Sequence, residues 1–124
     1  MSRVIAQKVT PADTGITELY RAPERTEAVI DQVVVANSDG SSQSFSVYHG
    51  GENVEADSIT AADRIAKGTV DAADVDTALD ANEGVKLEAG QAIFVESGSA
   101  DVVTFTVFGK KAAEGFVFGS PVAS

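Results

Sequence analysis

One histidine is the best candidate for acid–base chemistry in this sequence. His49 ends a predicted strand, and Glu52 or Glu55, which follow two glycines, could complete a catalytic dyad with it. A catalytic triad would also need an activated serine on a sharp turn, and the chain contains no G-x-S-x-G elbow. We therefore interpret His49 as a histidine that caps the end of a strand, and we predict that the protein is not an enzyme.

A run of acidic residues in the middle of the chain makes calcium the metal to consider. Five carboxylates with no basic residue among them could supply the oxygen ligands that this ion prefers: Asp71, Asp74, Asp76, Asp80 and Glu83. An EF-hand loop would need an acid or Asn two positions after Asp76 and then a glycine, whereas the chain has Ala78 and Leu79. We predict a solvated acidic segment and no cofactor, with calcium as the alternative.

Composition argues against several other chemistries. The chain of 124 residues has no cysteine, so it can form neither a disulfide nor a thiolate metal site. Neither G-x-x-x-x-G-K-[ST] nor G-x-G-x-x-G occurs, which speaks against a phosphate-binding loop. Paired carboxylates for glycoside hydrolysis are available, but without tryptophan and with only two tyrosines the chain offers few aromatic platforms for a sugar.

The charge balance is strongly acidic. Nine Lys and Arg against 19 Asp and Glu give a net charge of −10, which repels phosphate groups, so we expect neither nucleic acid nor an anionic membrane as a partner. Such a charge is better tolerated at high ionic strength, where screening weakens self-repulsion. The sequence has no apolar run of about 18 residues and no apolar signal region at its start, so we expect neither a membrane span nor a Sec-type signal.

The elements that must position these residues read as strands. Apolar residues fall in short runs bounded by Gly, Asn, Asp, Ser and Pro, which predicts an all-β domain. The predicted strands cover residues 3–9, 17–21, 27–36, 43–49, 84–89, 91–97 and 102–108, and residues 69–81 read as a further strand interrupted by an acidic turn. We predict a β-sandwich of jelly-roll or Greek-key topology, with about eight strands and one short helical or irregular insertion.

Alternation within these strands predicts the core, and helical spacing predicts the insertion. The expected core residues are Val29 or Ile30, Val33, Val35, Phe45, Val47, Leu87, Ile93, Val95, Val103, Phe105 and Val107. Residues 58–67 could make a short helix, because Ile59, Ala62 and Ile65 would share one side and Ser58 or Thr60 could cap it.

Both ends of the chain carry apolar residues outside the recognised core. We predict an N-terminal arm over residues 1–15, a sandwich domain over 16–109 and a C-terminal tail over 110–124. Arms that flank a small sandwich can reach adjacent copies, so the predicted intersubunit residues are Val4, Ile5, Phe116, Val117 and Phe118. The alternative is that both arms complete the sheets of their own domain.

Four segments occur in an order that is known from another group of proteins. An LYxxP strand lies at residues 19–23, and residues 33–37 match the long strand that, in this group, ends in an Asn-rich hairpin. A G-x-x-L-x-x-G-x-x-I-x-V strand pair lies at 84–95, and a final V-x-F-x-x-F-G strand lies at 103–109. In this respect the chain resembles small virion proteins of tailed phages over about residues 16–109, and it departs from them in residues 61–74, where the group is more aromatic.

The resemblance implies a fold and a virion context, and it transfers no catalytic residue. It implies a structural subunit of the tail, neck or fibre, located in the virion after assembly in the host cytoplasm, with other virion proteins as partners. Symmetric copies of the chain are expected as well. The alternatives are a capsid decoration protein and, from a different class, a carbohydrate-binding or receptor-binding module whose site would lie in the loops.

Overall fold

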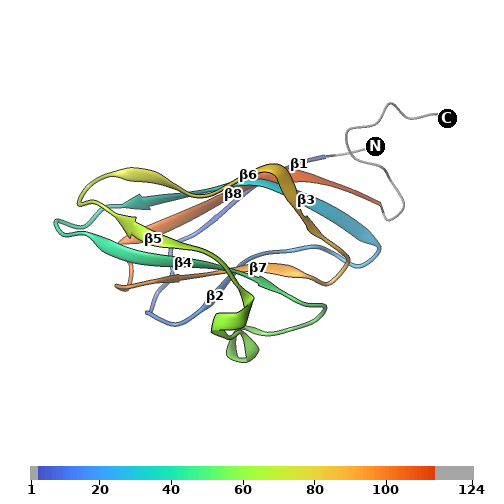
Figure 1. Cartoon of the computed structure of the whole chain (residues 1–124), viewed down its shortest axis with the longest axis horizontal. Helices are drawn as coiled ribbons and strands as arrows, with labels where there is room; N and C mark the ends of the chain where they lie inside the picture. The colour runs from blue at the N-terminus through green and yellow to red at the C-terminus, as the bar shows by residue number, and fades with distance from the viewer. Residues whose placement is uncertain (1–2, 114–124) are drawn as a thin grey trace.

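The chain folds into two antiparallel sheets that face one another (Figure 1). The computed structural model describes residues 3–113, without the side chains of residues 3 and 81–83. Sheet A has the order β1 (Arg3–Val9), β8 (Val103–Ala113), β3 (Thr26–Asn37) and β6 (Val75–Leu87). Sheet B has the order β2 (Thr17–Arg21), β7 (Ala92–Ser97), β4 (Gln43–Gly50) and β5 (Arg64–Val70).

The strand order is that of a jelly roll. Strand β1 pairs with β8, β2 with β7, β3 with β6 and β4 with β5, so the chain folds like a long hairpin wrapped over both sheets. Two further pairings, β3 with β8 and β4 with β7, join these ribbons into the two sheets. The predicted all-β sandwich is therefore confirmed.

The core lies between the sheets and follows the predicted alternation. Ile30, not Val29, points inward on β3, because the register alternates from Ala28 through Ile30. The other ten predicted core residues are also buried: Val33, Val35, Phe45, Val47, Leu87, Ile93, Val95, Val103, Phe105 and Val107.

The predicted helix over residues 58–67 is wrong. Two short 3-10 turns, η1 (Ala56–Ser58) and η2 (Ala61–Asp63), are followed directly by β5. Thr60 does cap η2: its side chain accepts a hydrogen bond from the Ala62 N–H, and the Asp63 carboxylate accepts one from the backbone N–H of Thr60. The insertion packs on the outside of sheet B, where Ile59 joins a second apolar cluster with Tyr48, Ala92 and Phe94.

The sheets extend beyond residues 16–109 at both ends. Residues 3–9, predicted as a strand within an N-terminal arm, form β1 and pair with β8 along their whole length, so the strand is confirmed and belongs to sheet A. Strand β8 continues to Ala113 and stays paired with β3 there. The predicted strand at 84–89 is the end of β6, whose pairing with β3 shifts register twice. No helix among the described residues has the length and apolar character needed to cross a membrane.

Candidate functional site

His49 contacts the opposite sheet. Its Nε2 atom lies 3.3 Å from the carbonyl oxygen of Lys86 on β6, so the ring bridges the two sheets near the end of β4. Glu52 and Glu55 lie in the loop that follows β4, and in the described part of the chain neither forms a hydrogen bond or an ion pair with His49. The structure thus gives His49 one exposed contact with β6 and does not assemble the considered dyad.

The acidic residues considered for calcium are spread along one edge of sheet A. Asp71 and Asp74 lie in the turn before β6, while Asp76 and Asp80 lie on β6 itself. The side chains of Asp74 and Asp76 accept hydrogen bonds of 2.8 Å from the backbone N–H of the next residue. No cluster of three or more metal-ligating side chains occurs in the described residues, and the side chain of Glu83 lies outside them.

Asn37 is a buried polar residue that the sequence analysis missed. Its Nδ2 group donates to the carbonyl oxygens of Ser41 at 2.8 Å, Asp71 at 3.1 Å and Val70 at 3.3 Å. Its Oδ1 atom accepts from the backbone N–H of Asp39 at 2.9 Å. Asn37 therefore ties the β3–β4 loop to the turn between β5 and β6. An Asn at a strand end before Asp-Gly was the available signal.

The same loop holds a carboxylate in the charged form. Hydrogen bonds from the Ser41 hydroxyl, the Gly40 backbone and the Gln43 amide keep the pKa of Asp39 below its usual value. The loop is polar and its tip is ordered by its own side chains, and it presents no aromatic ring on which a sugar could stack.

Arg21 fastens the insertion to sheet B. Its Nε atom donates to Glu18 at 2.9 Å, and its two terminal nitrogens donate to the carbonyl oxygens of Gly90 and Val54. The guanidinium carbon lies 5.7 Å from the centre of the Phe94 ring. One planar side chain thus links β2, the β6–β7 turn and the insertion, a role that requires the fork geometry of arginine.

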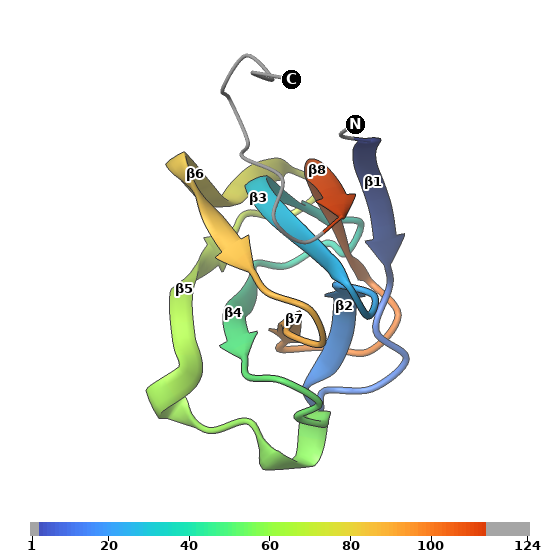
Figure 2. The same cartoon turned by 90° about the vertical axis from the view of Figure 1, so that its right-hand side faces the viewer.

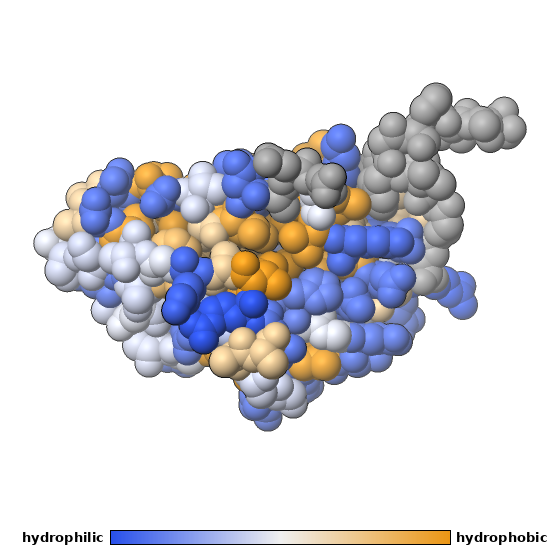
Figure 3. Space-filling view, in the orientation of Figure 1, coloured by the Kyte–Doolittle hydropathy of each residue, from blue (hydrophilic) through white to orange (hydrophobic). Residues whose placement is uncertain are grey.

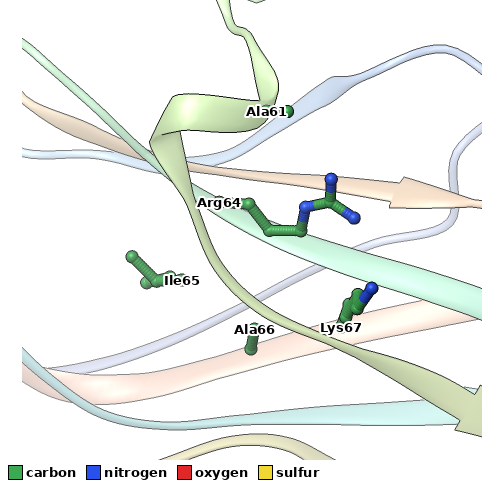
Figure 4. Close-up of a pocket in the computed structure, with 5 residues that line it drawn as sticks. All are labelled: Ala61, Arg64, Ile65, Ala66 and Lys67. Carbon is green, nitrogen blue, oxygen red and sulfur yellow. The ribbon is translucent and has the colours of Figure 1, made fainter.

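A basic hollow lies where the insertion enters β5. It has a volume of about 330 Å³ and is lined by Ala61, Arg64, Ile65, Ala66 and Lys67. Figure 4 shows Arg64 and Lys67 extending to one side of β5 and Ile65 to the other. Neither cation forms an ion pair with any described residue, so the hollow could receive a small anionic group.

Apolar side chains reach the surface at several strands. The largest exposures are those of Val4 (79%), Val75 (61%), Ile65 (40%) and Phe108 (39%). Figure 3, which views the side where β5 and β6 lie, shows hydrophobic residues emerging between more hydrophilic ones. Of the predicted intersubunit residues, Val4 is exposed, Ile5 is buried in the core of its own domain, and Phe116, Val117 and Phe118 lie outside the described residues.

No protein-family model and no curated protein matches the chain.

Proposed function

We propose that the protein is a non-enzymatic structural subunit of a tailed virus particle, associated with the tail, neck or fibre and present in symmetric copies. The observation that carries the proposal is the jelly-roll strand order, since this architecture recurs in viral capsid domains. Lectins and cupins use the same architecture, so the fold by itself does not select a function. We favour the virion role over the other uses of this fold because residues 16–109 resemble small phage virion proteins.

The surface of the molecule supports an assembly role. A structural subunit needs no reacting group, only surfaces that neighbouring subunits can cover. Val4, Val75, Ile65 and Phe108 provide exposed apolar area on three edge strands and on β8, which lies next to an edge. Apolar area at sheet edges suits lateral contact between subunits, with other virion proteins or with further copies.

The basic hollow favours one alternative, a ligand-binding module. Arg64 and Lys67 would suit an acidic sugar or another anionic group on a receptor. A binding measurement with sialic acid and with a neutral hexose would separate the two functions. Binding of sialic acid that is lost in the Arg64→Ala variant would favour the module over the structural subunit.

The proposal is tested by locating the protein in purified virus particles from the source that encodes it. Mass spectrometry should detect the chain in particles at many copies. Antibody labelling in the electron microscope should place it at the tail, neck or fibre, whereas a label spread over the head would indicate a capsid decoration protein. Absence from particles in which the major virion proteins are detected would refute both.

A truncation tests whether the C-terminal tail contributes to incorporation. Removal of residues 114–124 leaves β8 intact, because Ala112 and Ala113 are still paired with β3. We expect the truncated protein to fold and to incorporate less well than the full chain. Equal incorporation would show that the predicted contacts of Phe116, Val117 and Phe118 are not needed.

A further inference from the structure

The sandwich has four edge strands, and three of them are irregular. Strand β2 has five residues, and its pairing with β7 shifts register between Glu18 and Tyr20. The pairing of β5 with β4 shifts near Tyr48, and that of β6 with β3 shifts twice. Such irregularities hinder the addition of another strand to an edge, and they are a common protection against unwanted pairing.

Strand β1 is the exception. It pairs with β8 through seven consecutive residues, from Arg3 opposite Lys111 to Val9 opposite Phe105, without a register shift. It contains neither proline nor any of the 19 acidic residues of the chain. The side chains of Val4, Ala6, Gln7 and Lys8 are exposed, and Figure 2 shows β1 at the margin of sheet A with no described strand beyond it. Among the described residues no strand pairs with the outer side of β1, which leaves its backbone groups available to a partner strand.

We propose that a second copy of this chain pairs with β1, strand to strand and antiparallel, about a two-fold axis at Ala6. With this register every residue of β1 has a partner: Ala6 lies opposite Ala6 of the partner subunit, Val4 opposite the partner's Lys8, and Ile5 opposite the partner's Gln7. The two copies of sheet A join into one sheet to which each copy contributes four strands. The pairing specifies how the symmetric copies expected from the proposed function contact one another, and it rests on that function for the expectation that such copies exist.

The side chains of β1 fit this arrangement. The residue at the axis is an alanine, so the two strands can approach without a steric conflict. Lys8 lies opposite an apolar valine and not opposite a second cation, which avoids the repulsion that like charges cause across a strand pair. Phe108 lies beside Ala6 in the register of β1 with β8, so two copies of this half-exposed ring would flank the axis and extend the apolar contact.

The absence of cysteine from the chain allows a direct test of the register. In an Ala6→Cys variant the two sulfurs meet at the axis, where Cα atoms of opposed residues lie within the range that a disulfide spans. The matched control is Val4→Cys on the same strand and the same face. In the proposed register the residue at position 4 lies four residues along the strand pair from position 4 of the partner subunit, a separation of about 13 Å, which is too far for a disulfide.

At micromolar protein under mild oxidation, we expect the Ala6→Cys variant to form a covalent dimer at least roughly tenfold faster than the Val4→Cys variant. Equal rates, or no dimer from Ala6→Cys, would overturn the pairing. Pairing of β1 with β6 of the next copy would likewise leave Ala6→Cys unlinked and would give rings or chains in light scattering.

Charged substitutions of Ala6, the residue at the axis, provide the second test. Ala6→Lys and Ala6→Glu variants place like charges opposite each other, so each is expected to weaken the dimer by roughly fivefold or more, and a mixture of the two should restore it. Thermal melts check that both variants fold, as expected for an exposed position. No weakening in either variant would contradict the two-fold axis at Ala6.

The outcomes separate this pairing from the proposed function. If both tests fail but the protein is still incorporated into particles, the pairing is refuted and the virion function is not. If the protein dimerises through β1 but is not found in particles, the virion function is refuted and the pairing is not.

Discussion

At the scale of single residues, the Tyr20 hydroxyl is a buried polar group with no hydrogen-bond partner among the described residues. An unsatisfied buried hydroxyl lowers stability, because it has lost its hydrogen bonds to water and gained none. We expect Tyr20→Phe to raise the free energy of unfolding by about 1 kcal/mol, measured by urea denaturation. A loss of stability would show that this hydroxyl has a partner in solution.

The Tyr48 hydroxyl, unlike that of Tyr20, has a hydrogen-bond partner, and its protonated form stabilises the fold. Burial, followed by the 2.7 Å hydrogen bond to Glu96, raises the pKa of Tyr48 above its ordinary value of 10.0. Because the folded-state pKa is the higher one, the stabilisation is complete below about pH 10 and is lost as the pH rises through the folded-state pKa. Above about pH 10, the unfolding free energy should fall less steeply with pH in Tyr48→Phe than in the parent protein. Equal slopes would contradict the role of Tyr48.

Asn37 is the residue whose loss should loosen the loops most. Asn37→Ala removes the donors to Ser41, Val70 and Asp71 and leaves those carbonyl groups without this partner. We expect a loss of about 2 to 4 kcal/mol in the free energy of unfolding, measured in urea. The matched control is Ser38→Ala, which removes one exposed hydrogen bond to Val102 and should cost well under 1 kcal/mol. Similar losses in both variants would contradict the special role of Asn37.

Residues of the core could be predicted from the sequence, whereas these polar links could not. Phe45, Val47 and Phe105 follow a strict alternation, and alternation is a local property of a half-buried strand. Arg21 and Asn37 contact segments that lie 69 and 34 residues away in the chain, at Gly90 and Asp71. Only the folded topology brings such segments together.

At the scale of elements, Gly109 is a position where β8 and β3 approach too closely for a side chain. A methyl group there would overlap the carbonyl oxygen of Val29, next to the point where the register of β3 shifts. We expect Gly109→Ala to lower the free energy of unfolding by about 3 kcal/mol, measured by urea denaturation. Gly40→Ala is the control, because nothing lies within 4 Å of the added methyl. Equal stability of the two variants would contradict the close approach.

The wrong helix over residues 58–67 has a physical reason. Ile59, Ala62 and Ile65 are spaced as on one side of a helix, but they serve three different environments. Ile59 packs on Phe94 outside sheet B, Ala62 is exposed in η2, and Ile65 lies at the register shift of β5. The apolar surface that Ile59 covers lies on distant strands, so helical spacing in the sequence gave no information about it.

At the scale of the whole molecule, the sequence predicts the topology only as jelly roll or Greek key and does not give the strand order. Alternation and turns locate strands, but the pairing of β1 with β8 joins residues about 100 positions apart, and neither strand contains a signal for the other. Alternation predicts a strand at residues 3–9, but it does not show which strand is its neighbour, so the sequence could not reveal that β1 forms a regular edge of sheet A.

The net charge of −10 predicts how the whole molecule responds to salt. Acidic residues outnumber basic ones by 19 to 9 in the chain as a whole, so repulsion among them opposes the compact state, and screening removes much of it. We expect the melting temperature to rise by about 4 °C between low salt and about 1 M sodium chloride. Chloride is the appropriate salt, since sulfate would strengthen apolar burial in any protein.

A charge-reduced variant separates self-repulsion from general salt effects. Asp71 and Asp74 are exposed in the turn before β6, and asparagine at both positions keeps the size of the side chains while removing two negative charges. The double variant should melt higher than the parent at low salt, and its gain on adding salt should be smaller, because less repulsion is left to screen. If the parent shows no gain, or if both proteins gain equally, repulsion among the acidic residues does not limit the stability of the fold.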